Sequence, residues 1–164
     1  MLTPYALDAR VIRNGVAVAG GFLATMPAYQ PQNASANLQM KFDGYLNLLA
    51  GVYIRPTALQ TATADQMVVG WITDAETRAT NAGKPFGITQ GSIQTLASIQ
   101  RTFDNYKSVK EAITDLVDNV DGAGQFDVIF NPDRSYDITN QLGRDITAWE
   151  LTYPAQLAGQ GVAT

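Results

Sequence analysis

The sequence predicts an α+β domain in which strands open and close the chain and two amphipathic helices lie between them. Three observations support this class: an Asn-Gly pair between two short apolar runs, two capping motifs that each precede an apolar stripe of helical period, and an alternating segment near residue 125. We expect a single domain over 1–164, with mainly strands in 1–56, mainly helix in 57–122, and a β-hairpin and strand in 123–164.

The first hairpin is expected around Asn14-Gly15, because both central residues of a type I′ turn need positive φ. Arg10 and Arg13 beside this turn are expected to belong to a solvated strand face. Gly20-Gly21 then indicates a bulge or a close approach of another backbone segment.

Three further predictions cover the rest of the N-terminal third. The Pro and Asn content of "PAYQPQNASAN" (27–37) predicts a loop. In "NLQMKFDGY" (37–45), Leu38, Met40 and Phe42 alternate with polar residues, which predicts a half-buried strand. The segment "GYLNLLAGVYI" (44–54) fits either a helical turn or a further strand, and both alternatives stay open.

Two capped helices are expected in the middle of the chain. Thr63 with Gln66 and Ser108 with Glu111 form capping boxes, and Gly83 followed by Pro85 ends the first helix. The segment 86–103 is mixed and is expected to be extended. The apolar stripes are Ala64, Met67, Val68, Trp71, Ile72, Ala75 and Ala79 in the first helix, and Val109, Ala112, Ile113, Leu116, Val117 and Val120 in the second.

The last third is predicted to return to strands. Phe126, Val128 and Phe130 share one face of a strand, and Pro132 favours a turn at "NPDRS". The segments "YDITNQL" and "RDITAWELTYP" are expected to be the following strands.

Composition excludes several classes of function. The chain has no His and no Cys, which removes Ser-His-Asp and Cys-His catalysis and the usual zinc and iron sites. It has no phosphate-binding loop, its net charge of −4 argues against nucleic acid, and it has no apolar run long enough to span a membrane. The N-terminus lacks the pattern of a signal peptide. Charged residues make up 16%, below the usual quarter or so, so we expect partners to cover part of the surface.

The acidic run "DLVDNVDGAGQFDV" contains Asp115, Asp118, Asp121 and Asp127 with Asn119 and Gly122, and it raises the question of a calcium loop. Placing Gly122 at position 6 of an EF-hand loop puts Val117 and Val128 at positions 1 and 12, where oxygen ligands are needed. The run is therefore predicted to be a helix end, a glycine reversal and the start of a strand, with no metal.

Two other groups of residues are weighed as sites. Paired carboxylates can hydrolyse glycosides only when they face one groove, and Asp133, Asp137, Asp145 and Glu150 are instead expected to serve turns and strand faces. We therefore predict no enzyme, no catalytic residue and no cofactor. Surface aromatics can bind sugars or anchor interfaces, which leaves a carbohydrate-binding or adhesion module as the alternative function. The aromatics considered are Trp71, Trp149, Tyr5, Tyr29, Tyr45, Tyr53 and Tyr153.

The order of these pieces resembles siphophage tail-tip or baseplate-hub proteins, with the Gp37-like siphovirus family the nearest. The likeness runs through the "RNG" hairpin ending "AGGFL", "NLQMKFDGYLNLLAGVYI", "TADQMVVGWITDAETRA", "RTFDNYKSVKEAITDLVDNVDGAGQFDVIFNPDRSYDI" and "WELTYPAQL", from about residue 8 to 157. Each motif occurs in many folds, and the order and spacing are what carry the resemblance.

The resemblance implies a structural role and no catalytic residues. Hubs of this family are trimers at the distal end of the tail tube, so the expected partners are other tail proteins and copies of the chain itself. The chain would be an internal piece of a longer hub protein, made in the bacterial host cytoplasm and located in the virion tail. Its apolar contacts are expected at the first hairpin and at "GYLNLLAG", which should then be exposed in the isolated piece.

Overall fold

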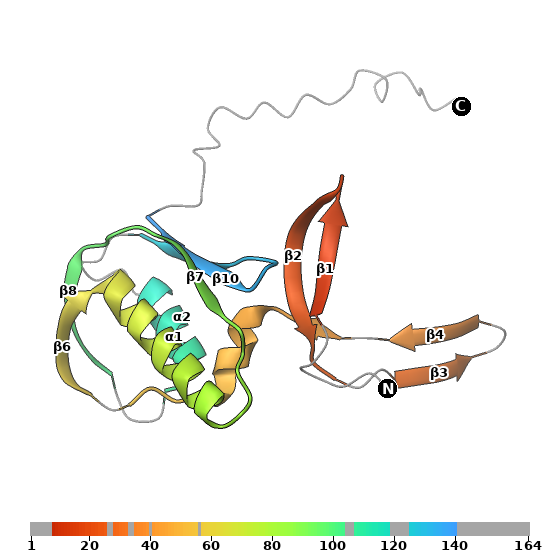
Figure 1. The fold of residues 1–164 in the computed structure, drawn as a ribbon, viewed down its shortest axis with the longest axis horizontal. Coiled ribbons are helices and arrows are strands. Elements are labelled where there is room, and N and C mark those ends of the chain that lie inside the picture. The colour runs from red at the N-terminus through yellow and green to blue at the C-terminus, as the bar shows by residue number, and fades with distance from the viewer. Residues whose placement is uncertain are drawn as a thin grey trace, which may run out of the picture.

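The computed structural model describes residues 8–25, 28–32, 35–39, 41–55, 57–103, 107–118 and 125–140. It confirms the α+β class (Figure 1). The elements in order are β1 (Asp8–Arg13), β2 (Val16–Leu23), β3 (Ala28–Gln32), β4 (Ser35–Gln39), β5 (Phe42–Asp43), the 3-10 helix η1 (Tyr45–Gly51), β6 (Thr57–Thr63), α1 (Ala64–Asn81), β7 (Thr89–Ile93), β8 (Ser98–Phe103), α2 (Val109–Asp118), β9 (Asp127–Phe130) and β10 (Ser135–Thr139).

Two helices and two small sheets enclose the core. Figure 1 shows α1 and α2 side by side, with β6 and β8 on one flank and β7 and β10 on another. The strands β6 and β8 pair antiparallel, and β10 lies between β9, which is antiparallel to it, and β7, which is parallel. The region expected to be mainly helical therefore also contains β6, β7 and β8. The core includes Leu49, Met67, Val68, Ile72, Phe103, Val109, Ile113, Leu116, Phe126, Tyr136 and Ile138.

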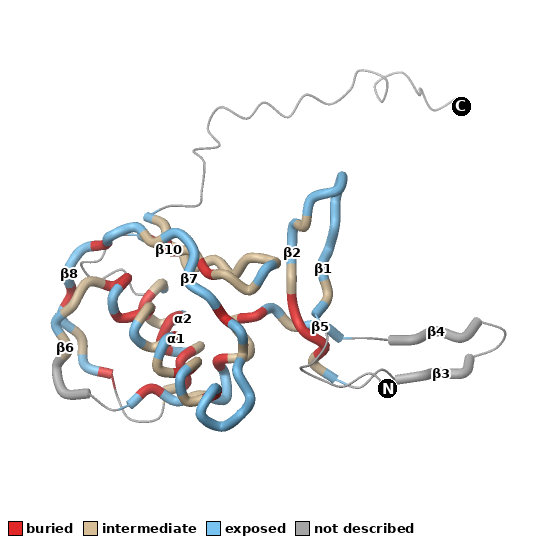
Figure 2. Tube along the Cα trace, viewed as in Figure 1, coloured by how far each residue is buried: buried red, intermediate tan, exposed pale blue. Residues whose placement is uncertain are grey.

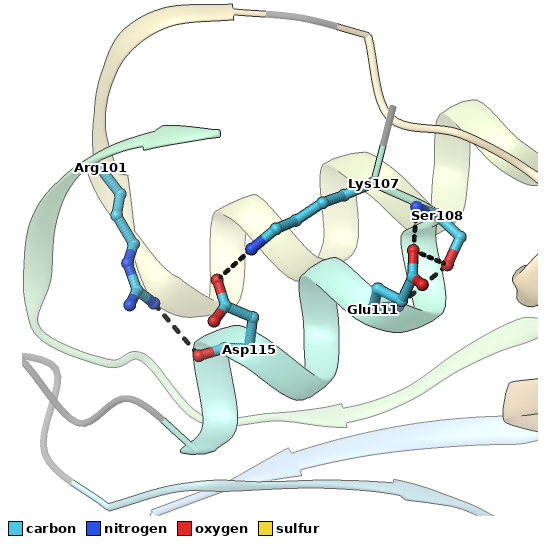
Figure 3. Close-up of polar contacts among 5 residues, drawn as sticks. All are labelled: Arg101, Lys107, Ser108, Glu111 and Asp115. Atoms are coloured by element: carbon cyan, nitrogen blue, oxygen red, sulfur yellow. Dashed lines mark hydrogen bonds and ion pairs between the residues drawn. The ribbon is translucent and has the colours of Figure 1, made fainter. Parts of the chain in front are cut away.

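The ends of both helices follow the predicted signals. At α1 the Thr63 amide donates to Gln66 Oε1 at 3.5 Å, which is one arm of the predicted capping box, and Gly83 adopts a φ of 72° just beyond the C-terminus of the helix. At α2 the Ser108 amide donates to Glu111 Oε2 at 2.8 Å, and the Glu111 amide donates back to Ser108 Oγ at 3.1 Å (Figure 3). These bonds span only three residues, which is why sequence spacing alone predicts them.

The N-terminal hairpin also forms as predicted. Asn14 and Gly15 have φ values of 51° and 79°, so the turn places both central residues in the left-handed region. The bulge lies farther along the hairpin, between Val11 and Ile12 in the register. The glycine pair instead permits close approach: a Cβ on Gly20 would lie 2.6 Å from Pro132 Cα, and one on Gly21 would lie 2.4 Å from Asp43 O.

Two predictions for the N-terminal third are wrong. Segments 28–32 and 35–39 are the paired strands β3 and β4 where a loop was expected, and Pro31 is tolerated because both strands of a two-stranded sheet are edges. The single strand expected over 37–45 is divided between β4 and β5, which belong to different sheets, and Phe42 is exposed. Alternation indicates that strand geometry is favoured, but it does not say where a strand changes partner.

Candidate assembly surface

The hairpin of β1 and β2 projects from the body formed by the helices, and its distal part is exposed (Figure 2). Several of its exposed residues are aliphatic. The exposed fractions are 60% for Val11, 67% for Ile12, 63% for Val16 and 56% for Val18. Val16 pairs with Arg13, and side chains two residues apart on a strand share a face, so Val11, Arg13 and Val16 line the same face. Val18 is the extra residue at the bulge and has no partner in the register. We call Val11, Ile12, Val16 and Val18 the hairpin patch.

The base of the hairpin is fixed to the body. Phe22 and Leu23, at the end of β2, are fully buried, and both pair with β5. Gly20 lies directly against Pro132 in the turn between β9 and β10. The same strand thus begins in solvent and ends in the core, so the exposure of the hairpin patch is a property of the distal half alone.

An arginine from the distant β9–β10 turn holds this base in place. Arg134 Nη2 and Nε donate to the two carboxylate oxygens of Asp8 at 2.6 and 3.1 Å, across 126 residues of sequence. Its guanidinium carbon lies 5.4 Å from the centroid of the Tyr45 ring, and its Nη1 donates to the Phe86 carbonyl. The hydrogen bond to Asp8 is the main cause that raises the pKa of Arg134. No sequence signal connects these residues, so sequence analysis missed this contact.

The prediction that the large apolar side chains of "GYLNLLAG" are exposed is wrong. The segment forms η1, in which Tyr45 and Leu49 are 1% and 0% exposed, while Leu46 and Leu48 pack half-buried against the core. Burial is also the main cause that raises the pKa of Tyr45. The segment contacts α2, so the domain itself covers the apolar surface that had been assigned to trimer contacts.

The acidic run is accounted for by local structure where the chain is described. Asp115 Oδ2 accepts a hydrogen bond from Lys107 Nζ at 2.9 Å, and the Asp115 carbonyl accepts one from Arg101 at 3.3 Å (Figure 3). Asp118 is exposed at the end of α2, and Asp127 is half-buried in β9. Residues 119–124, including Asp121 and Gly122, lie outside the described part. Among the described residues, no group of three His, Cys, Asp or Glu is placed to hold a metal ion.

The carboxylates of the last hairpin are engaged in structural hydrogen bonds. Asp133 Oδ1 accepts from the amide and hydroxyl of Ser135 at 2.9 and 2.7 Å, and these bonds lower the pKa of Asp133. Asp137 accepts from the Ser92 amide at 2.6 Å and from Asn131 Nδ2 at 2.7 Å. These partners hold the Asp133 carboxylate toward the turn and the Asp137 carboxylate toward β7. Asp145 and Glu150 lie outside the described residues.

The aromatic residues do not form an exposed group in the described part of the chain. Tyr45 is buried, and Trp71 is half-buried with its ring edge-on to Phe103 at 4.7 Å. Among residues whose burial is described, the exposed large aromatics are Phe42 and Tyr53. The side chains of Tyr5, Tyr29, Trp149 and Tyr153 lie outside the described residues.

One open groove lies between α1 and the sheet of β7 and β10. It has a volume of about 310 Å³, and its lining includes Ile72, Glu76, Thr80, Ile88 and Tyr136. Glu76 Oε1 and Oε2 accept hydrogen bonds from the amides of Gly87 and Ile88 at 3.0 and 3.4 Å, which hold the carboxylate at this groove. We call it the α1 groove.

Comparison with protein-family models, curated proteins and solved structures found no match for this chain. Among the described residues, no helix is long and apolar enough to cross a membrane.

Proposed function

We propose that the chain is a structural, non-enzymatic component of the tail tip of a bacteriophage or prophage, acting in protein–protein assembly at the distal end of the tail. The observation that carries the proposal is the hairpin patch. Four large aliphatic side chains stand in solvent on a ribbon whose base is firmly built into the domain.

Such a ribbon favours a role in assembly for a physical reason. A two-stranded hairpin gains little stability in water, and an exposed apolar strand edge invites pairing with another chain. In the described part of the chain no strand pairs with the outer edge of β1. A binding partner that covers the hairpin patch would remove this apolar surface from water. In a tail tip, the proteins that surround a hub would provide this cover.

The partners under this proposal are other tail proteins and copies of the chain itself, with a trimer as the expected state. The protein would be made in the bacterial host cytoplasm and end in the virion tail. The resemblance of the motif order to siphophage hub proteins suggests which assembly the hairpin patch serves, and the low charged fraction of 16% agrees with a surface that partners cover.

The test is to locate the protein in particles. Antibodies against the chain should label the distal end of the tail in purified virions, and deletion of the gene should leave tails without a complete tip. The proposal would be rejected if complete tails assembled after deletion of the gene and purified wild-type virions contained no trace of the protein. In complementation, Val16→Lys should fail to restore tips, whereas Thr114→Lys, at an exposed position of α2, should restore them.

A further inference from the structure

We propose that the tip of the hairpin inserts into the α1 groove of a second copy of the chain, with Arg13 facing Glu76 of that copy. The inference rests on the self-assembly in the proposed function and names the two surfaces that meet. These surfaces are different parts of one chain, so the contact is head-to-tail, and it closes into a ring when the rotation between copies permits.

The α1 groove offers one negative charge among exposed polar side chains, over a closed apolar floor. The exposed polar lining residues are Thr73, Thr77, Thr80, Asn81 and Gln90. Ile72, Ile88 and Tyr136 line it and are almost fully buried. Glu76 is the charged residue among the described lining residues, and no described cation forms an ion pair with it. Its two hydrogen bonds from backbone amides fix the carboxylate without neutralising its charge. An incoming cation therefore meets a carboxylate that is already positioned.

The hairpin tip offers the complementary chemistry. Arg13 shares a face with its exposed cross-strand partner Val16, and the preceding residue Ile12 is exposed on the other face. Arg13 forms no ion pair with any described acidic residue. Asp8, the carboxylate of β1, lies at the base of the hairpin and is held there by Arg134. The distal half of the hairpin thus carries an unpaired positive charge, and the groove carries a negative charge surrounded by hydrogen-bonding side chains.

The hairpin does not reach its own groove in this structure. Figure 1 shows the turn of the hairpin at the end remote from α1. The contacts of Gly20 with Pro132 and of Asp8 with Arg134 hold the hairpin in this direction. Insertion between copies satisfies both surfaces without moving either, which favours a second copy over closure within one chain.

A charge exchange tests the contact. Arg13→Glu and Thr80→Arg should each weaken self-association of the 164-residue chain by about fivefold, the effect of a partly exposed ion pair. Thr80 is exposed and lies one helical turn from Glu76 on α1, so Thr80→Arg adds a positive charge to the groove without disturbing the core. The double variant should associate more tightly than Arg13→Glu alone, because the guanidinium introduced beside Glu76 in the groove of the next copy offsets the repulsion between Glu76 and the carboxylate introduced at the hairpin tip. Sedimentation equilibrium measures all four proteins.

Cross-linking identifies which surfaces meet. The chain has no native cysteine, so Val16→Cys and Thr80→Cys each introduce a single thiol. When the two variants are mixed and oxidised, disulfides should form mainly between them, while Thr114→Cys should form few with either. Disulfides that form only between two Val16→Cys chains would show hairpin-to-hairpin contact and overturn the inference.

The remaining outcomes also decide the matter. A wild-type chain that stays monomeric at every concentration, or a double variant that associates no better than Arg13→Glu alone, overturns the contact between hairpin and groove. Labelling of the tail tip by antibodies would then still support the proposed function, and the hairpin patch would bind a different tail protein. The two proposals can therefore fail separately.

Discussion

Replacing Gly21 by Ala is the sharpest test of how the hairpin joins the domain. A Cβ at this position would lie 2.4 Å from Asp43 O and 3.1 Å from Asp43 C. Both are backbone atoms of β5, the strand that pairs with the end of β2, so no side chain can move aside. The two residues that follow, Phe22 and Leu23, are fully buried and would have to shift with the strand.

The magnitude follows from overpacking. Inserting a methyl group into a close-packed backbone contact costs typically about 1–3 kcal/mol, and the absence of a flexible neighbour places Gly21→Ala in the upper half of that range. Gly70 is the matched control because it lies in the interior of α1, is exposed, and has no atom within 4 Å of a built Cβ. Gly70→Ala should therefore stabilise the protein by about 0.8–1 kcal/mol through helix propensity.

Thermal unfolding followed by far-UV circular dichroism distinguishes the two variants. For a chain of this size, 1 kcal/mol shifts the midpoint by about 2–4 °C. Gly21→Ala should lower the midpoint by roughly 4–12 °C, and Gly70→Ala should raise it by roughly 2–4 °C. The reasoning is refuted if Gly21→Ala unfolds at the wild-type temperature or above it, or if both substitutions shift the midpoint in the same direction.

Three further predictions concern the body of the domain. Leu116→Ala should cost about 2–5 kcal/mol in urea unfolding because the side chain is fully buried in the core, and a loss below 1 kcal/mol or so would contradict that burial. The buried Asp65 accepts a hydrogen bond from the Leu96 amide at 2.9 Å. Asp65→Ala should therefore lower the free energy of unfolding by about 1–3 kcal/mol and speed hydrogen exchange at Leu96, whereas Asp65→Asn keeps an acceptor. Equal exchange at Leu96 in both variants would argue against this bond. The bond from the Ser108 amide is the main cause that lowers the pKa of Glu111. The stability it contributes is present above the unfolded pKa and is lost as pH falls through the depressed folded value. The urea midpoints of wild type and Glu111→Gln should therefore differ at neutral pH and converge in acid. A difference that stays constant from neutral to acid pH would count against the capping box.

Features that depend on near neighbours in the chain were accessible from the sequence. The turn at Asn14-Gly15, the capping box of Ser108 and Glu111, and the helix end at Gly83 each arise from contacts or backbone angles within a few residues. The apolar stripes of both helices were predicted for a similar reason, because helical period alone determines which side chains share a face.

The tertiary structure decided which surfaces stay exposed. The sequence placed apolar residues both in the hairpin and in "GYLNLLAG", yet only the hairpin patch remains in solvent, because α2 packs on η1 and no described element packs on the distal hairpin. The contact between Asp8 and Arg134 and the parallel pairing of β7 with β10 likewise join segments far apart in the chain. Periodicity shows that a face is apolar, but only the packing of the folded chain decides what covers it.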